Sequence, residues 1–235
     1  MRQVVLDTET TGLSWEKGNR VVEIGCLELL ERRPTGRTFH RYLNPDRDME
    51  SGAEEVTGLT REFLSDKPRF GEVVDEFLAF IDGAELVIHN AVFDVGFLDH
   101  ELSLLGPQYG RIGDRASVLD SLALARERFP GQRNSLDALC KRLGVNNAHR
   151  KLHGALLDAE ILAEVYVALT SGQHELGLDA GGADASGPVV AMAVPDRPGR
   201  VIRAGDAELH SHRERLAALA RKAGGPSVWE RLEGG

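Results

Sequence analysis

The sequence has no long hydrophobic run, few cysteines and a shortage of positive charge. Its apolar stretch from Pro188 to Pro195 is far shorter than the ~20 residues a helix needs to cross a bilayer. No basic segment followed by an apolar one lies near Met1, so we expect no secretory signal and a cytoplasmic protein. Cys26 and Cys140 lie far apart without metal-ligand spacing, which favours buried, reduced thiols over a zinc site.

The charge balance is acidic, with 28 Lys and Arg against 37 Asp and Glu and a net charge of -9. Proteins that bind nucleic acid without sequence preference are normally basic, so this balance argues against binding through the protein's own positive charge. Carboxylates that hold divalent ions can still place positive charge at a site. The charge therefore leaves nucleic-acid chemistry open until the acidic residues are placed.

The 235 residues, 42% of them hydrophobic, predict one large domain with an appendage. Apolar periodicity predicts strands over 3–7, 21–30, 38–43 and 86–88. It predicts helices over 70–81, 93–105, 135–143 and 152–169, and one that runs from the segment 118–120 to Phe129. The first three strands have short connections and are expected to be antiparallel, whereas the later strands arrive through helices and are expected to be parallel to a neighbour. The predicted fold class is α/β, a mixed sheet flanked by helices.

The composition changes after residue 170. Residues 179–199 are rich in Gly, Ala, Pro and Asp and have no period, which is typical of a flexible linker. Helical spacing returns over Glu208–Ala223 and is followed by the apolar pair Val228-Trp229. Because a single small helix cannot fold stably alone, we expect this tail to dock on another protein.

Asp7-Thr8-Glu9 lies at the end of the apolar strand 3–7. Residues two apart on a strand point to the same face, so the two carboxylates repel each other unless a cation lies between them. The small residues Thr10-Thr11-Gly12 come next and are expected to offer exposed backbone N–H groups to a phosphate or base. The alternative is a solvated strand end followed by a turn.

Three further residues have the chemistry to complete a site. Asp94 lies in the first turn of the helix after strand 86–88, where the alternative is simple stabilisation of the helix dipole. Asp158 lies in an apolar helical run and needs a partner or a metal. His153 would be turned roughly 140° away from Asp158 on a regular helix, so the two converge only if His153 precedes regular winding. The alternative for His153 is a solvent-exposed cap.

Four acids and one histidine make an oxygen-rich site that suits Mg²⁺ or Mn²⁺. Such a site fits two-metal phosphoryl chemistry, with ions about 3.5–4 Å apart. A histidine titrates near neutral pH, so His153 can take the proton from the attacking water.

Three motifs carry a resemblance to a known family. Asp7-Thr-Glu-Thr-Thr-Gly12, His89-Asn-Ala-Val-Phe-Asp94 and His153-Gly-Ala-Leu-Leu-Asp158 resemble the exonuclease motifs of the DEDDh family. The longer runs from Arg133 to Cys140 and from Leu152 to Tyr166 are similar to the proofreading (epsilon) subunits of bacterial DNA polymerase III. The likeness covers about residues 1–172 and resumes at the tail, around Arg200-Val-Ile and Gly224-Gly225 with Trp229.

The resemblance implies a ribonuclease-H-like fold and removal of nucleotides from the 3′ end of single-stranded or frayed DNA. It implies that Asp7, Glu9 and Asp158 bind the tighter metal ion. Asp7 would also touch the second ion, and Asp94 would reach that ion partly through water. His153 would be the general base.

The resemblance also implies contacts to the terminal nucleotide. Asp7, Glu9 and Asp158 would lie against it, and further contacts would come from Thr11, Gly12, Leu13, Val56, Thr57 and Phe93. Some members of the family have His where this chain has Thr57 and an acidic residue where it has Gly52. This departure leaves the catalytic set unchanged.

Two partners are implied as well. Gln173, Leu176 and Leu178 resemble the bacterial sliding-clamp motif, in which a Gln and two apolar residues fill a groove; the alternative is a frayed helix end. Residues 200–235 are similar to the part that binds the large (alpha) polymerase subunit. We therefore predict an exonuclease domain over 1–172, a clamp-binding peptide and linker over 173–199, and a polymerase-binding tail over 200–235. The remaining hypotheses are a free-standing DEDDh exonuclease acting on RNA or in DNA repair, and a catalytically silent scaffold bridging clamp and polymerase.

Overall fold

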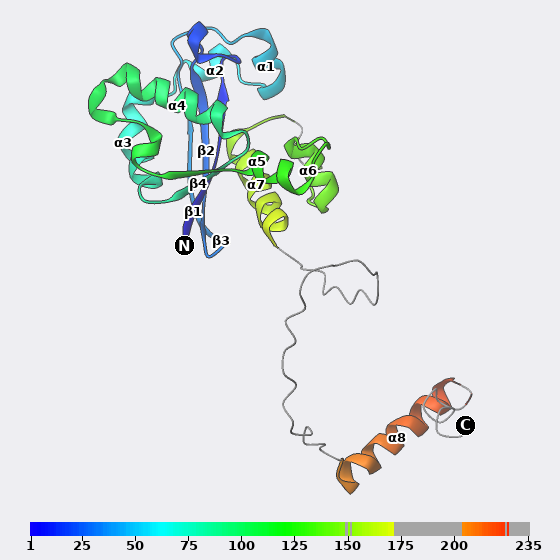
Figure 1. Cartoon of the computed structure of the whole chain (residues 1–235). Helices are drawn as coiled ribbons and strands as arrows, with labels where there is room; N and C mark the ends of the chain where they lie inside the picture. The colour runs from blue at the N-terminus through cyan, green and yellow to red at the C-terminus, as the bar shows by residue number, and fades with distance from the viewer. Residues whose placement is uncertain (149, 151, 172–203, 224, 226–235) are drawn as a thin grey trace, which may run out of the picture. The chain divides into compact units, whose positions relative to one another are not determined.

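A five-stranded mixed sheet forms the centre of the first unit of the chain (Figure 1). This computed structural model describes residues 1–148, 150, 152–171, 204–223 and 225. The chain divides into two units, Met1–Leu178 and Asp179–Gly235. The second contributes helix α8 (Asp206–Ala223), close to the helix predicted there. Among the described residues, no helix is both long and apolar enough to cross a membrane.

The strands lie in the order β3-β2-β1-β4-β5, and their bounds are β1 Arg2–Thr10, β2 Val21–Leu30, β3 Arg33–Tyr42, β4 Glu85–Ile88 and β5 Ser117–Asp120. The pairs β1–β2 and β2–β3 are antiparallel, and the pairs β1–β4 and β4–β5 are parallel. The predicted fold class and strand directions are confirmed. Strand β1 continues to Thr10, three residues beyond the predicted end, so Glu9 lies within the strand together with Asp7. Residues 118–120, which were expected to lead into a helix, belong to β5.

The described residues of this unit form seven helices, with the bounds α1 Ser51–Thr57, α2 Arg61–Leu64, α3 Phe70–Ile81, α4 Ala91–Leu105, α5 Ser121–Arg128, α6 Leu136–Leu143 and α7 Ala155–Thr170. Three short 3₁₀ turns cover Trp15–Lys17, Pro107–Tyr109 and Ile112–Asp114. Helix α3 has the predicted bounds, and α7 begins three residues later than predicted. Helices α1 and α2 were not predicted, because they are too short for an apolar period to show.

Alternate residues of β1 face opposite sides of the sheet, as a strand requires. Val4 and Leu6 pack into a core that includes residues of α3 and α4, whereas Val5 packs into a second core that includes residues of α7. Figure 1 shows α3 and α4 on one side of the sheet and α7 on the other. Asp7 and Glu9 share the alternation of Val5, so their side chains lie on the α7 side of the sheet.

Both cysteines are free and buried, as predicted. Cys26 belongs to the core between the sheet and α3 and α4, and Cys140 belongs to a core under α6 and α7. Desolvation raises the pKa of the Cys26 thiol far above its ordinary value. Such a thiol is unreactive, which fits a packing role.

Candidate active site

The predicted acids and histidine converge on one cavity of about 260 Å³. Asp7, Glu9, Asp94, His153 and Asp158 all line this cavity, which therefore gathers residues from β1, α4, α7 and the segment before α7. The other lining residues are Thr8, His89, Asn90, Phe93, Ser135, Leu136, Asp137 and Arg150. A larger hollow of about 810 Å³, lined by Trp15 and His100 among others, contains none of the five.

A glycine on β2 lets helix α7 approach the strand that carries Asp7. Gly25 is paired with Asp7 across β1 and β2. A Cβ atom at Gly25 would lie 2.2 Å from the backbone carbon of Ala155 and 2.2 Å from the nitrogen of Leu156. The first turn of α7 therefore rests on bare backbone, and this contact sets how closely Asp158 can approach Asp7.

Asp94 is held against β1 by hydrogen bonds. Its Oδ1 accepts from the backbone N–H of Thr8 at 3.0 Å and from the Thr8 hydroxyl at 2.7 Å. The chain turns from β4 into α4 through Asn90, which has a left-handed backbone (φ 69°) and whose N–H donates to Asp120 Oδ1 at 3.1 Å. A left-handed non-glycine residue is often found at functional sites. Asp94 is thus a buried residue facing the cavity, which dipole stabilisation alone does not explain.

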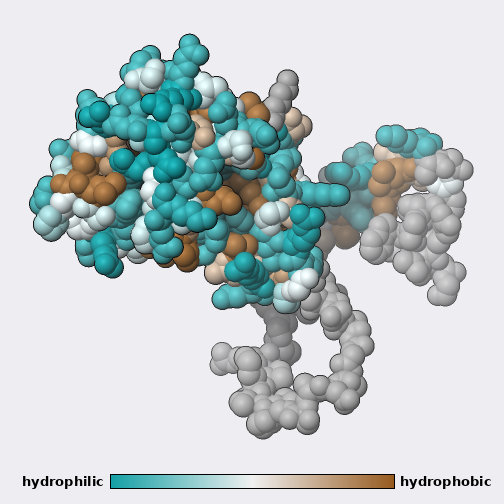
Figure 2. Space-filling view, turned by 90° about the horizontal axis from the view of Figure 1, so that it is seen from above, coloured by the Kyte–Doolittle hydropathy of each residue, from teal (hydrophilic) through white to brown (hydrophobic). Residues whose placement is uncertain are grey.

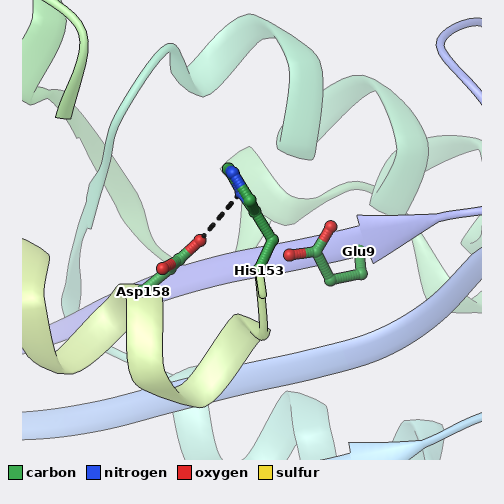
Figure 3. Close-up of side chains that lie close together, drawn as sticks. All are labelled: Glu9, His153 and Asp158. Atoms are coloured by element: carbon green, nitrogen blue, oxygen red, sulfur yellow. Dashed lines mark ion pairs between the residues drawn. The ribbon is translucent and has the colours of Figure 1, made fainter. Parts of the chain in front are cut away.

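His153 lies just before α7, which begins at Ala155. Its backbone N–H donates to the Val56 carbonyl at 3.0 Å, and its Nδ1 lies 3.3 Å from Asp158 Oδ2. This position is the one required for His153 and Asp158 to converge. Glu9, His153 and Asp158 each offer one ligand atom, and these atoms lie within 4.8 Å of one another (Figure 3).

The carboxylates crowd one another in a poorly hydrated place. Desolvation, followed by the charges of Asp94 and Glu9, raises the pKa of Asp7 well above its ordinary value. Desolvation and the charge of Asp158 raise the pKa of Glu9 to about 8. Desolvation also raises the pKa of Asp94 to about 7, although its bonds from Thr8 act in the opposite direction. The carboxylate oxygens of Asp7, Glu9, Asp94 and Asp158 fit a hard divalent cation such as Mg²⁺ or Mn²⁺.

Three of the predicted nucleotide contacts have apolar side chains that are exposed or line the cavity. Leu13 is 85% exposed and Val56 is 46% exposed, and Phe93 lines the cavity. On the face drawn in Figure 2, hydrophobic residues form small patches among hydrophilic ones. Small apolar patches suit contact with a nucleobase or sugar.

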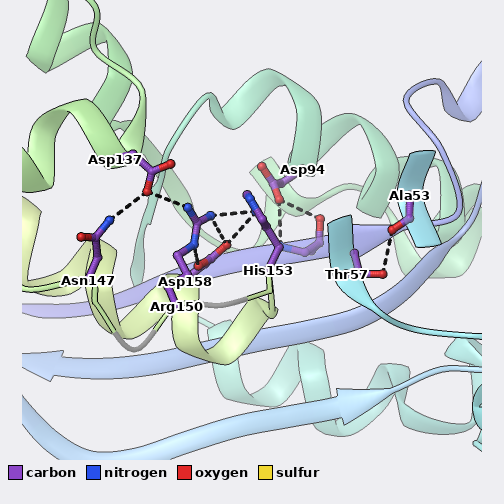
Figure 4. A network of polar contacts seen from close by, with 9 residues as sticks. Ala53, Thr57, Asp94, Asp137, Asn147, Arg150, His153 and Asp158 are labelled. Carbon is purple, nitrogen blue, oxygen red and sulfur yellow. Dashed lines mark hydrogen bonds and ion pairs between the residues drawn. The ribbon is translucent and has the colours of Figure 1, made fainter. Parts of the chain in front are cut away.

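Besides the three acids, the remaining predicted contacts are Thr11, Gly12 and Thr57. They form hydrogen bonds or close contacts with other parts of the protein. The Thr11 N–H donates to the Arg20 carbonyl at 2.9 Å, and Thr11 is fully buried, so the expectation of an exposed N–H at this position is wrong. A Cβ at Gly12 would lie 2.3 Å from Cδ of Glu50. The Thr57 hydroxyl donates to the Ala53 carbonyl at 2.8 Å within α1 (Figure 4).

Two charged residues of the cavity, Arg150 and Asp137, were missed by the sequence reasoning. The Arg150 guanidinium donates from Nε to Asp158 Oδ1 at 2.5 Å and from Nη2 to Asp158 Oδ2 at 2.6 Å (Figure 4). It also contacts Asp137 Oδ1 at 2.9 Å and His153 Nδ1 at 2.7 Å. The nearest Lys or Arg residues upstream of Asp158 are Lys151 and Arg150, and the sequence does not show which of the two pairs with Asp158.

The residues predicted to bind the sliding clamp, and part of the predicted polymerase-binding tail, are not among the described residues. Gln173, Leu176 and Leu178, the linker 179–199 and Trp229 lie outside the described residues. In the described part of the second unit, α8 has two exposed leucines, Leu209 and Leu219.

Comparison with known proteins places this geometry in context. The family model for exonucleases (RNase_T) matches residues 4–166. The chain is 48% identical to the DNA polymerase III subunit epsilon of Escherichia coli (strain K12) over 236 aligned residues, which cover 97% of each chain.

Two solved structures share the fold. Exonuclease X in complex with 5′ overhanging duplex DNA is 25% identical, with a TM-score of 0.56 over 71% of this chain and 90% of that one. The zinc-bound form of the E. coli ExoI–ssDNA complex is 18% identical, with a TM-score of 0.60 over 73% of this chain and 41% of that one. The second likeness concerns the fold alone.

Proposed function

The chain belongs to the exonuclease family that includes the DNA polymerase III epsilon subunits, and from this premise we propose that it proofreads DNA for a bacterial replicative polymerase. It is a metal-dependent 3′→5′ exonuclease. The observation that carries the assignment is the convergence of Asp7, Glu9, Asp94, Asp158 and His153 on one cavity.

In the proposed mechanism, Asp7, Glu9 and Asp158 would hold one Mg²⁺ or Mn²⁺ ion, and Asp7 and Asp94 would hold a second. When bound, the ions supply an activated water and stabilise the leaving oxygen. His153 takes the proton of that water, whose oxygen forms a bond to the terminal phosphorus. The bond from phosphorus to the 3′ oxygen of the preceding nucleotide breaks, and this oxygen takes a proton from solvent, which gives a nucleoside 5′-monophosphate and a new 3′ hydroxyl.

The substrate is the 3′ end of single-stranded or frayed DNA. We assign the last base and sugar to the apolar side chains of Leu13, Val56 and Phe93, since their exposure or place in the cavity leaves them open to a ligand. Thr11, Gly12 and Thr57 shape the surrounding backbone. The hydroxyls of Thr11 and Thr57 already form hydrogen bonds within the protein, and Gly12 is packed closely against Glu50.

A 5′-labelled single strand, and a duplex with a mismatched 3′ end, test the activity. We expect a ladder of products shortened from the 3′ end that depends on Mg²⁺ or Mn²⁺. Asp7→Ala should abolish it, whereas Asp75→Ala, which removes an exposed carboxylate from α3, should not. Full Mg²⁺-dependent activity in Asp7→Ala would refute the assignment of the metal site to Asp7, whereas a wild type that binds no metal would revive the silent-scaffold hypothesis.

The partners are tested separately. We propose that residues 200–235 bind the large (alpha) polymerase subunit and that Gln173, Leu176 and Leu178 bind the sliding clamp, which places the protein with the replisome in the bacterial cytosol. Deleting residues 196–235 should abolish co-elution with the polymerase subunit and leave nuclease activity intact. Continued co-elution of the shortened protein would disprove the tail assignment, whereas a full chain that does not co-elute with the polymerase subunit would favour a free-standing exonuclease.

A further inference from the structure

Arg150 pairs with Asp158, a carboxylate that the proposed metal site needs as a ligand. Its side chain is 9% exposed, and its guanidinium forms a two-point contact with both oxygens of Asp158 at 2.5 and 2.6 Å. Two-point guanidinium–carboxylate contacts are among the stronger hydrogen-bonded pairs in proteins. A divalent ion bound to the same carboxylate would be repelled by the guanidinium at this distance. Arg150 and the ion therefore compete for Asp158.

The same guanidinium covers His153. Its Nη2 lies 2.7 Å from His153 Nδ1. Guanidinium nitrogens donate hydrogen bonds and never accept them, so Nδ1 accepts here and the proton of a neutral ring lies on Nε2. A base needs a free lone pair, and neither ring nitrogen offers one in this arrangement.

Movement of Arg150 away from Asp158 changes the histidine as well. His153 Nδ1 is 3.3 Å from Asp158 Oδ2, so a proton on Nδ1 can then be shared with that oxygen. Nε2 becomes the free acceptor in that tautomer. One displacement thus frees a ligand and a base together.

The structure also offers a second partner for the displaced guanidinium. Asp137 on α6 already accepts from Arg150 Nη1 at 2.9 Å, and its carboxyl is 62% exposed. Asn147 donates to the same Asp137 oxygen at 2.9 Å and fixes its orientation. Figure 4 shows Arg150 between Asp137 on one side and Asp158 and His153 on the other.

We propose that Arg150 is a positioning residue that keeps the metal-free site closed by pairing with Asp158 and His153, and that ion binding transfers it to Asp137. The inference rests on the metal site of the proposed function. It predicts that the wild type binds divalent ions less tightly than a variant that has the same carboxylates but lacks the Arg150 guanidinium.

Calorimetric titration of the full chain with Mn²⁺, without DNA, tests the competition. Arg150→Gln and Arg150→Ala should each bind Mn²⁺ about tenfold or more tightly, as expected when one competing charge-assisted hydrogen bond is lost. Arg150→Lys keeps the charge without the two-point contact and should fall between these variants and the wild type. Arg133→Ala removes the same charge from an exposed position and should stay within about twofold of the wild type.

A double-mutant cycle tests the role of Asp137. Asp137→Asn should weaken Mn²⁺ binding in the wild-type background and have no effect when Arg150 is already Ala. A direct effect of the Asp137 charge on the ion would persist in both backgrounds and would overturn this part of the proposal.

Two results overturn the proposal in distinguishable ways. If the wild type binds Mn²⁺ but every Arg150 variant that folds cooperatively binds it equally or less tightly, Arg150 does not compete with the ion. If the wild type binds no Mn²⁺, the metal site of the proposed function fails, and this inference fails with it.

Discussion

Gly25→Ala is a one-methyl change whose effect on the site follows from geometry. The added Cβ would lie 2.2 Å from backbone atoms of Ala155 and Leu156. Carbon atoms in contact rest about 3.5–4.0 Å apart, so the first turn of α7 must retreat by more than ~1 Å. The obstacle is backbone and cannot be relieved by a rotamer change. We therefore expect a loss of stability near the upper end of the ~1–3 kcal/mol typical of overpacking.

The same displacement moves the catalytic groups. Asp158 lies in that turn, and His153 lies just before it. A shift of about 1 Å in reacting groups can lower activity about 10²-fold, so we expect kcat/KM of Gly25→Ala to fall by that order. This loss should persist at temperatures where the variant is fully folded.

Urea unfolding and the rate of 3′ shortening of a 5′-labelled oligonucleotide measure the two effects. Gly113→Ala is the matched control, because a Cβ there would meet nothing within 4 Å. It should leave both stability and kcat/KM close to those of the wild type. Wild-type stability and activity in Gly25→Ala would refute the claim that bare backbone at β2 positions α7.

Two further predictions concern the carboxylates. The raised pKa values of Glu9 (about 8) and Asp94 (about 7) mean that the folded metal-free protein keeps protons that the unfolded chain has released. The free energy of unfolding should therefore fall as pH rises between about 5 and 7, by ~1.4 kcal/mol per pH unit for each such group. Urea unfolding in chelator should show this slope, and saturating Mg²⁺ or Glu9→Gln should reduce it; a flat profile in chelator would contradict the pKa shifts. Thr8→Val removes the hydroxyl that donates to Asp94 at 2.7 Å and should weaken Mn²⁺ binding or activity roughly 10–100-fold, as loss of a bond to a metal ligand does. Unchanged Mn²⁺ affinity and activity in Thr8→Val would show that the backbone N–H of Thr8 is sufficient to orient Asp94.

Sequence periodicity predicted much of the sheet and its helices, because long apolar faces leave a clear pattern. Helix α3 and strand β2 have the predicted bounds. Helix α1 is held by local bonds such as the Thr57 hydroxyl to the Ala53 carbonyl, which leave no periodic signal. Short elements fixed by polar contacts are therefore the ones that pattern analysis misses.

The site was predictable to the extent that its chemistry depends on residue type and spacing. Asp158 could be singled out because a carboxylate on an apolar stripe needs a partner, and the required position of His153 before the helix followed from helix geometry. Gly25 and Arg150 could not be found in this way. Gly25 acts on a helix that is distant in the sequence, and Arg150 reaches Asp158 through the conformation of the loop before α7. Only the folded structure shows these two contacts.

The acidic net charge and the nucleic-acid substrate are compatible once the carboxylates are placed. Desolvation, together with the charges of neighbouring acids, raises the pKa values of Asp7 and Glu9, so the metal-free fold favours binding protons or a cation there. Arg150 is the cation that the chain itself supplies, but a single guanidinium cannot neutralise four carboxylates. The remaining negative charge favours divalent ions, and those ions in turn attract the phosphate of a 3′ end. The bound ions thus concentrate positive charge at the reacting phosphate. A uniformly basic protein surface would distribute that charge along the whole nucleic acid.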